Sequence, residues 1–107
     1  MMTNEIIGVA TFTAKSGKAD ALRKALFDLL EPTRREDGCL SYTLNENLNN
    51  PNVFTMIERF KNKMSFESHC NEPYLLHFKE NMLGELVESS SISVELYKEI
   101  DEKIFKK

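Results

Sequence analysis

The chain of 107 residues is 41% hydrophobic and 29% charged, which is typical of one soluble domain with a modest core. Its 14 basic and 17 acidic residues give a net charge of -3 without a basic stripe, so nucleic acid is not an expected partner. The sequence starts without a positively charged leader, and no apolar run reaches the roughly 18 residues that a membrane span needs. We therefore expect a single cytoplasmic domain over residues 1–107, with no membrane partner.

The first predicted strand spans residues 6–14, where both faces carry apolar or small side chains that need to be covered. A long helix is predicted over residues 18–37, because leucines recur there at helical spacing. Pro32 removes one helical hydrogen bond, so we expect a kink or a restarted turn near Glu31. Gly38 is expected to end this helix in a left-handed conformation.

A β-hairpin is predicted next, with strands over residues 39–47 and 53–60 on either side of a turn rich in asparagine. One side of the second strand carries Phe54, Met56, Glu58 and Phe60. Glu58 is the one charged side chain in this row, and a carboxylate removed from water is unstable unless it is paired or protonated. Glu58 therefore needs a partner or a chemical role.

The first of two predicted short helices follows Asn62, which is a good N-cap residue. Phe66, His69 and Cys70 lie at i, i+3 and i+4, so they share one face of this helix. Cys39 and Cys70 lack the spacing of a zinc or dithiol pair and are read as small buried thiols. The position of Cys70 beside His69 also leaves a reactive thiolate open.

The second short helix is predicted to begin near Pro73, since proline fits the first helical turn, and to close at Gly84. Its predicted core stripe consists of Leu75, Phe78 and Met82. The last strand is predicted over residues 92–100, and the tail beyond it is expected to fray or to dock on a partner.

The order strand, helix, strand, strand, helix, strand is the split βαβ arrangement of ferredoxin-like α+β domains. It predicts a four-stranded antiparallel sheet with both helices on one face. The opposite face is then uncovered, although several strands carry apolar residues on both sides. Pairing of two sheets around a two-fold axis would cover it, so we expect a homodimer.

Three segments carry a resemblance to a known family. They are EPTRREDGCLSYTL at residues 31–44, PNVFTMIERF at residues 51–60 and SFESHCNEPYLLHF at residues 65–78. Together they resemble the antibiotic biosynthesis monooxygenase (ABM) family, whose members include small proteins described as quinol monooxygenases. The resemblance covers nearly the whole chain and implies a dimeric α+β barrel of ferredoxin-like subunits.

The family pattern includes a glutamate on the third strand and a histidine in the following short helix, which match Glu58 and His69. Many members continue from this histidine as HxxxPH, whereas this chain reads HCNEPY with Tyr74 in place of the second histidine. Many members also have tryptophan at the position of Phe60. The resemblance implies oxygenation of a quinol or polyphenol by O2 without a cofactor or a metal.

Such a reaction needs a base, an apolar pocket for the aromatic ring and polar groups that stabilise an oxyanion. His69 is the candidate base or oxyanion partner, and Glu58 is its orienting group or a second proton acceptor. The expected substrate-binding residues are Tyr42, Tyr74, Phe60, Phe66 and Phe78.

Structural readings of the same residues stay open. His69 could be satisfied by Glu58 or by a backbone carbonyl, and Glu58 could be paired with His69 or Arg59. A metal site that uses His69 and His77 would need further ligands that the sequence does not cluster.

Three other functions stay open as well. The first is an isomerase or other acid-base enzyme for a small dicarbonyl or sugar-like ligand, and the second is a non-catalytic module that binds a small molecule. The third is haem degradation, known in related barrels with asparagine on the first strand and tryptophan on the short helix. Those positions correspond to about Val9 and His69 here, which disfavours haem as a ligand.

Overall fold

The computed structural model describes residues 4–88 and 92–105. Its strands form one antiparallel sheet in the order β2-β3-β1-β4. The strands are β1 (Ile6–Thr13), β2 (Cys39–Glu46), β3 (Val53–Phe60) and β4 (Ser93–Tyr97). The predicted ferredoxin-like α+β fold is confirmed, and only the edge strand β4 is clearly shorter than expected.

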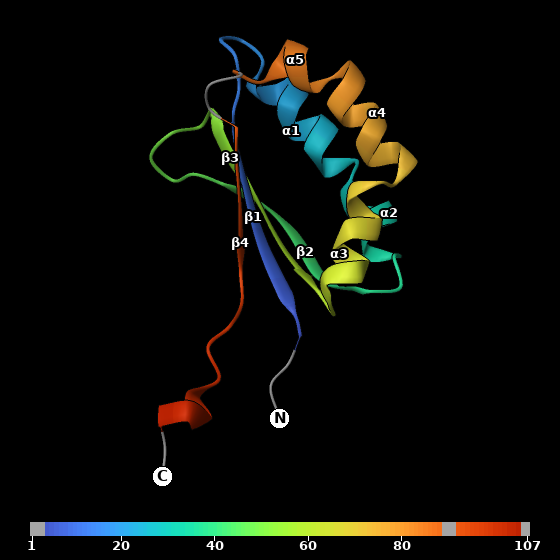
Figure 1. Cartoon of the computed structure of the whole chain (residues 1–107). Coiled ribbons are helices and arrows are strands. Elements are labelled where there is room, and N and C mark those ends of the chain that lie inside the picture. Colours follow the sequence, from blue (N-terminus) through green and yellow to red (C-terminus); the bar gives the residue numbers. More distant parts are fainter. Residues whose placement is uncertain (1–3, 89–91, 106–107) are drawn as a thin grey trace.

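The α-helices of the described ranges all lie on one face of the sheet (Figure 1). They are α1 (Ala19–Phe27), α2 (Leu30–Arg34), α3 (Lys63–Cys70), α4 (Pro73–Asn81) and α5 (Leu83–Leu86). None of them is both long and apolar enough to cross a bilayer.

The core lies between the sheet and these helices. Leu22 and Leu26 of α1 and Phe54 of β3 are completely buried, as the leucine spacing predicts. The rings of Phe12 and Phe78 meet edge to face with their centroids 6.2 Å apart. Full burial of such side chains contributes about 1.5–3 kcal/mol each, so this packing holds the two layers together.

The single long helix predicted over residues 18–37 is wrong, because α1 and α2 are separate helices. The break lies at Asp28 and Leu29 rather than near Glu31. Pro32 has no N–H to donate to the carbonyl of Asp28, four residues earlier, and it lies in the first turn of α2, where no helical donor is needed. The proline therefore moves the interruption toward the N-terminus.

Two predictions about helix ends are also wrong. Gly17, with φ of 74°, is the one described residue with a positive φ, so Gly38 is not a left-handed cap. A Cβ atom on Gly38 would overlap the Oγ atom of Ser65, so this glycine lets the chain before β2 contact α3. Gly84 lies within α5 instead of closing α4, and the side chain of Met82 is partly exposed and not a core residue.

The opposite face of the sheet is not covered by any described segment (Figure 1). The chain after β4 extends away from the sheet and ends in a short 3-10 helix, Glu102–Phe105. Ile100, Ile104 and Phe105 in this tail are largely exposed. Both the bare face and the tail therefore present apolar side chains to solvent.

Substitution of Gly38 by alanine is expected to lower the free energy of unfolding by about 1–3 kcal/mol, because the new methyl group overlaps Ser65. Urea denaturation at pH 7 measures the change. Gly84→Ala is the matched control, because open space surrounds a Cβ atom there and alanine favours a helix, so stability should rise by up to about 1 kcal/mol. Equal effects of the two substitutions would contradict the packing role of Gly38.

Candidate functional site

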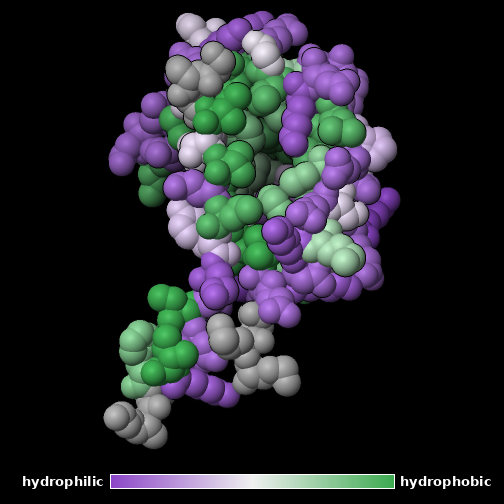
Figure 2. Space-filling view, viewed as in Figure 1, coloured by the Kyte–Doolittle hydropathy of each residue, from purple (hydrophilic) through white to green (hydrophobic). Residues whose placement is uncertain are grey.

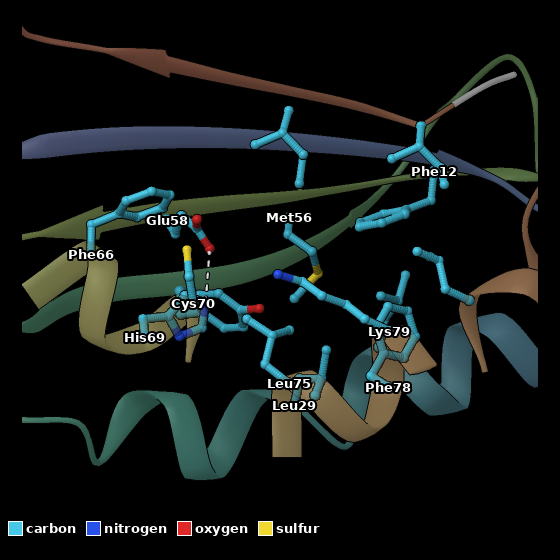
Figure 3. A pocket seen from close by; sticks show the side chains of 16 residues that line it. Phe12, Leu29, Met56, Glu58, Phe66, His69, Cys70, Leu75, Phe78 and Lys79 are labelled. Carbon is cyan, nitrogen blue, oxygen red and sulfur yellow. Dashed lines mark ion pairs between the residues drawn. The ribbon is translucent and has the colours of Figure 1, made fainter. Parts of the chain in front are cut away.

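A cavity of about 210 Å³ lies between the sheet and the helices (Figure 3). This volume is below the roughly 300–1,000 Å³ of pockets for drug-sized ligands, which favours a small ligand of one or two rings. Ile92 and Val94, beside and within the edge strand β4, line it on one side, where Figure 2 shows a hollow between β4 and the helices with apolar side chains along β4. The lining is mainly apolar, and its polar side chains are Tyr42, Glu58, His69, Cys70 and Lys79.

Glu58 reaches the cavity because alternate residues of β3 face the helices. All four residues of the predicted row on β3 are buried, and Glu58 is 6% exposed. Its neighbours in the sheet are Gly8 on β1 and Tyr42 on β2. A Cβ atom on Gly8 would lie 2.7 Å from Glu58 Oε1, so the glycine leaves the room that the carboxylate occupies.

His69 lies on α3, which begins as predicted at Asn62. The side chain of Asn62 accepts a hydrogen bond of 2.8 Å from the backbone N–H of Ser65, and this cap fixes the start of the helix. As a result Phe66, His69 and Cys70 all line the cavity, which confirms the shared face.

The imidazole of His69 lies between two carboxylates. Its Nδ1 atom is 3.0 Å from Glu36 Oε2, and its Nε2 atom is 3.7 Å from Glu58 Oε2. The ring also packs on Phe60 at 4.8 Å between centroids and meets Tyr42 edge to face at 5.5 Å. With 2% of its side chain exposed, His69 is held in one orientation by these contacts.

The sequence did not point to Glu36, which follows α2 and lies 33 residues before His69. Its carboxylate also accepts a hydrogen bond from the hydroxyl group of Tyr74. Glu36 lines two shallow hollows on the molecular surface in addition to contacting His69. The row Glu58–His69–Glu36 therefore runs from the cavity to the outside of the molecule.

The five residues expected to bind substrate divide into two groups. Tyr42, Phe66 and Phe78 line the cavity. Phe60 is completely buried beside His69 and does not line the cavity, and the hydroxyl group of Tyr74 is directed to Glu36 instead. Three of the five expected residues therefore line the cavity. The other two contact the acid-base row instead, Phe60 at His69 and Tyr74 at Glu36.

Burial raises the pKa of Glu58, and the charges of His69 and Lys79 partly oppose this rise. Burial also raises the pKa of the Tyr42 hydroxyl, so it remains a hydrogen-bond donor at neutral pH. The pKa of the Cys70 thiol is raised by burial as well, which disfavours a reactive thiolate at this position.

Two other partners that the sequence left open for Glu58 and His69 are Arg59 and a metal ion. Arg59 forms ion pairs with Glu5 and Glu99, at 2.6 and 3.6 Å, instead of pairing with Glu58. Within residues 4–88 and 92–105, no group of three or more histidine, cysteine, aspartate or glutamate side chains is arranged to hold a metal ion. A metal site that uses His69 and His77 therefore finds no support among the described residues.

The raised pKa of Glu58 predicts a pH-dependent stability. The folded chain binds this proton more tightly than the unfolded chain does, so Glu58 destabilises the fold increasingly as the pH rises above its unfolded pKa. We expect Glu58→Gln to increase the free energy of unfolding at pH 7 by on the order of 1 kcal/mol. Near pH 4, below the unfolded pKa, the gain should be small.

Urea denaturation at the two pH values checks this prediction. Glu67→Gln removes the charge of an exposed glutamate on α3 and serves as the matched control. A stability gain for Glu58→Gln that is the same at both pH values would contradict the assignment.

Comparison with known proteins identifies the family of the chain. Residues 6–81 match the model of the family described as antibiotic biosynthesis monooxygenase. A Mycobacterium tuberculosis protein named "Putative monooxygenase Rv0793" is 30% identical over 101 residues, which cover 94% of this chain and 97% of that protein. Its solved structure superimposes with a TM-score of 0.83.

Two further crystal structures are similar over most of their length. SO0527 from Shewanella oneidensis has a TM-score of 0.87 and 38% identity, with 91% of this chain and 92% of that chain covered. PA3566 from Pseudomonas aeruginosa has a TM-score of 0.86 and 29% identity, with 94% and 99% covered. Since the family model matches more than half of the sequence, the chain belongs to the antibiotic biosynthesis monooxygenase family.

Proposed function

We propose that this protein is a cofactor-independent monooxygenase that oxidises a small quinol or polyphenol with O2. The observation that carries the proposal is the buried row Glu58–His69–Glu36, which opens at one end into a small apolar cavity. The row offers proton acceptors and the cavity accepts an aromatic ring, which are the two parts that such a reaction requires.

In the proposed reaction the substrate hydroxyl group loses its proton to the end of the row at the cavity. Glu58 faces the cavity and burial raises its pKa, so it is a stronger proton acceptor than an exposed glutamate. The 3.7 Å between Glu58 and His69 exceeds a hydrogen bond, and a small movement of either side chain would close it. Glu36 orients the imidazole through its contact with the Nδ1 atom.

The deprotonated ring is electron-rich and can transfer one electron to O2, after which the two radicals combine to form a carbon–oxygen bond. One oxygen atom enters the ring and the other leaves as water, so a quinol and O2 give a hydroxyquinone and water. All four electrons that reduce O2 come from the quinol, and no external reductant is needed. Tyr42, which lines the cavity and keeps its proton, is placed to donate a hydrogen bond to the developing oxyanion.

We also propose that the protein is a homodimer in which two bare sheet faces meet. Ile57 on the bare face is 42% exposed, and the tail residues Ile104 and Phe105 are more exposed still. A second copy would remove these apolar side chains from water.

The activity is tested by oxygen uptake with a panel of reduced benzoquinones and naphthoquinones. We expect catalysed uptake above the spontaneous rate, with one atom of labelled oxygen in the quinone product. Glu58→Gln and His69→Ala should each lower kcat by about 10²- to 10⁴-fold because they remove a proton acceptor, whereas Glu67→Gln should leave it unchanged.

The absence of catalysed uptake with every quinol, in a folded protein that still binds aromatic ligands, would reject the monooxygenase. An isomerase or a non-catalytic binding module would then be favoured.

The dimer is tested by sedimentation equilibrium. We expect the wild-type chain to be dimeric and Ile57→Lys to shift it to a monomer, because a charge would be buried in the interface. Leu48→Lys, in the fully exposed hairpin loop, is the matched control and should remain a dimer. A wild-type chain that is monomeric at micromolar concentration would contradict the proposal.

A further inference from the structure

Lys79 is a cavity residue to which the proposed reaction assigns no role. It projects from α4 and lines the cavity together with Glu58 of the sheet. In Figure 3 its amino group is directed into the cavity, toward the end that holds Glu58 and Cys70. Lys79 is exposed to solvent, but its amino group is directed over the cavity rather than away from it.

The local sequence explains this direction. Residues three and four positions from Lys79 on the helix are Leu75, Leu76, Met82 and Leu83, so no acidic neighbour competes for its amino group. Leu75 and Leu83, four residues on either side, line the same cavity. Lys79 therefore lies on the edge of α4 where the cavity meets solvent.

The amino group of Lys79 forms no hydrogen bond or ion pair with any residue in the described ranges 4–88 and 92–105. Its positive charge nevertheless acts on Glu58 and on the Cys70 thiol, which shows that it lies within electrostatic range of both. Lys79 and Glu58 thus face each other across open space instead of forming an ion pair. A ligand in that space would meet a cation at one end and a proton acceptor at the other.

We propose that Lys79 makes the cavity selective for aromatic substrates that carry an anionic group, such as a carboxylate, at the end facing α4 and a hydroxyl group at the end facing Glu58. This inference rests on the proposed function only for the nature of the ring. The apolar walls hold the ring without fixing its direction, and the two charged groups then orient it. A charge-assisted hydrogen bond in a partly enclosed site is strong enough to decide between ligands of the same shape.

The test compares two probes of nearly equal shape, 6-hydroxy-2-naphthoate and its neutral amide, which have the hydroxyl group and the variable group at opposite ends. Neither probe needs O2 or turnover, and quenching of probe fluorescence at pH 7 gives the two dissociation constants. We expect the wild-type protein to bind the carboxylate roughly tenfold more tightly than the amide. Lys79→Met should reduce this preference to less than about twofold, and Lys79→Arg should retain most of it.

Lys63→Met is the matched control, because Lys63 is an exposed lysine at the start of α3 that does not line the cavity. Its preference should equal that of the wild-type protein. Equal affinity of the wild-type protein for the two probes, or a preference that survives in Lys79→Met, would overturn the role of Lys79 and leave the proposed monooxygenase untouched. Failure of both probes to bind would reject the aromatic site itself, and with it the proposed function.

Discussion

The burial of Glu58 in the sheet is the constraint around which the neighbouring elements are arranged. An ionised carboxylate that leaves water without a partner is destabilised by several kcal/mol. The chain reduces this penalty from three directions. Gly8 on β1 leaves space for the side chain, the imidazole of His69 lies 3.7 Å away, and the charge of Lys79 acts across the cavity. The remaining penalty appears as a raised pKa, which makes the carboxylate a stronger base than an exposed glutamate.

His69 gives the site its fixed geometry, because it is the contact between parts of the chain that are far apart in the sequence. The ring is held by Phe60 and Tyr42 from the sheet, and its two nitrogen atoms face Glu58 and Glu36. Because Glu36 reaches the molecular surface, the row Glu58–His69–Glu36 connects the cavity to the surface on the side away from β4. In the proposed reaction, a proton taken up by Glu58 returns to water along this row once a small movement closes the 3.7 Å gap to His69.

The parts of the site that the sequence could predict are those fixed by local periodicity. Alternation on β3 places Glu58 among buried apolar residues, and the i, i+3, i+4 spacing after the Asn62 cap places His69 and Cys70 on one face. Glu36 could not be found in this way, because it belongs to no periodic element and meets His69 only through the packing of the segment after α2 against α3. Lys79 did carry a signal, since leucines at i−4 and i+4 indicate that its side of the helix borders the core.

The same distinction explains the errors about the backbone. Pro32 and Gly38 have clear local preferences, but those preferences do not say which of several permitted roles the fold uses. Pro32 is accommodated in the first turn of a new helix, and Gly38 is required by the close approach of Ser65 rather than by its own dihedral angle. The same holds for Gly8, because a glycine inside a strand indicates that another group lies close to the backbone but does not identify that group. In this chain that group is the carboxylate of Glu58. Gly8, the residue of β1 with the lowest strand propensity, thus leaves the space that the proposed base occupies.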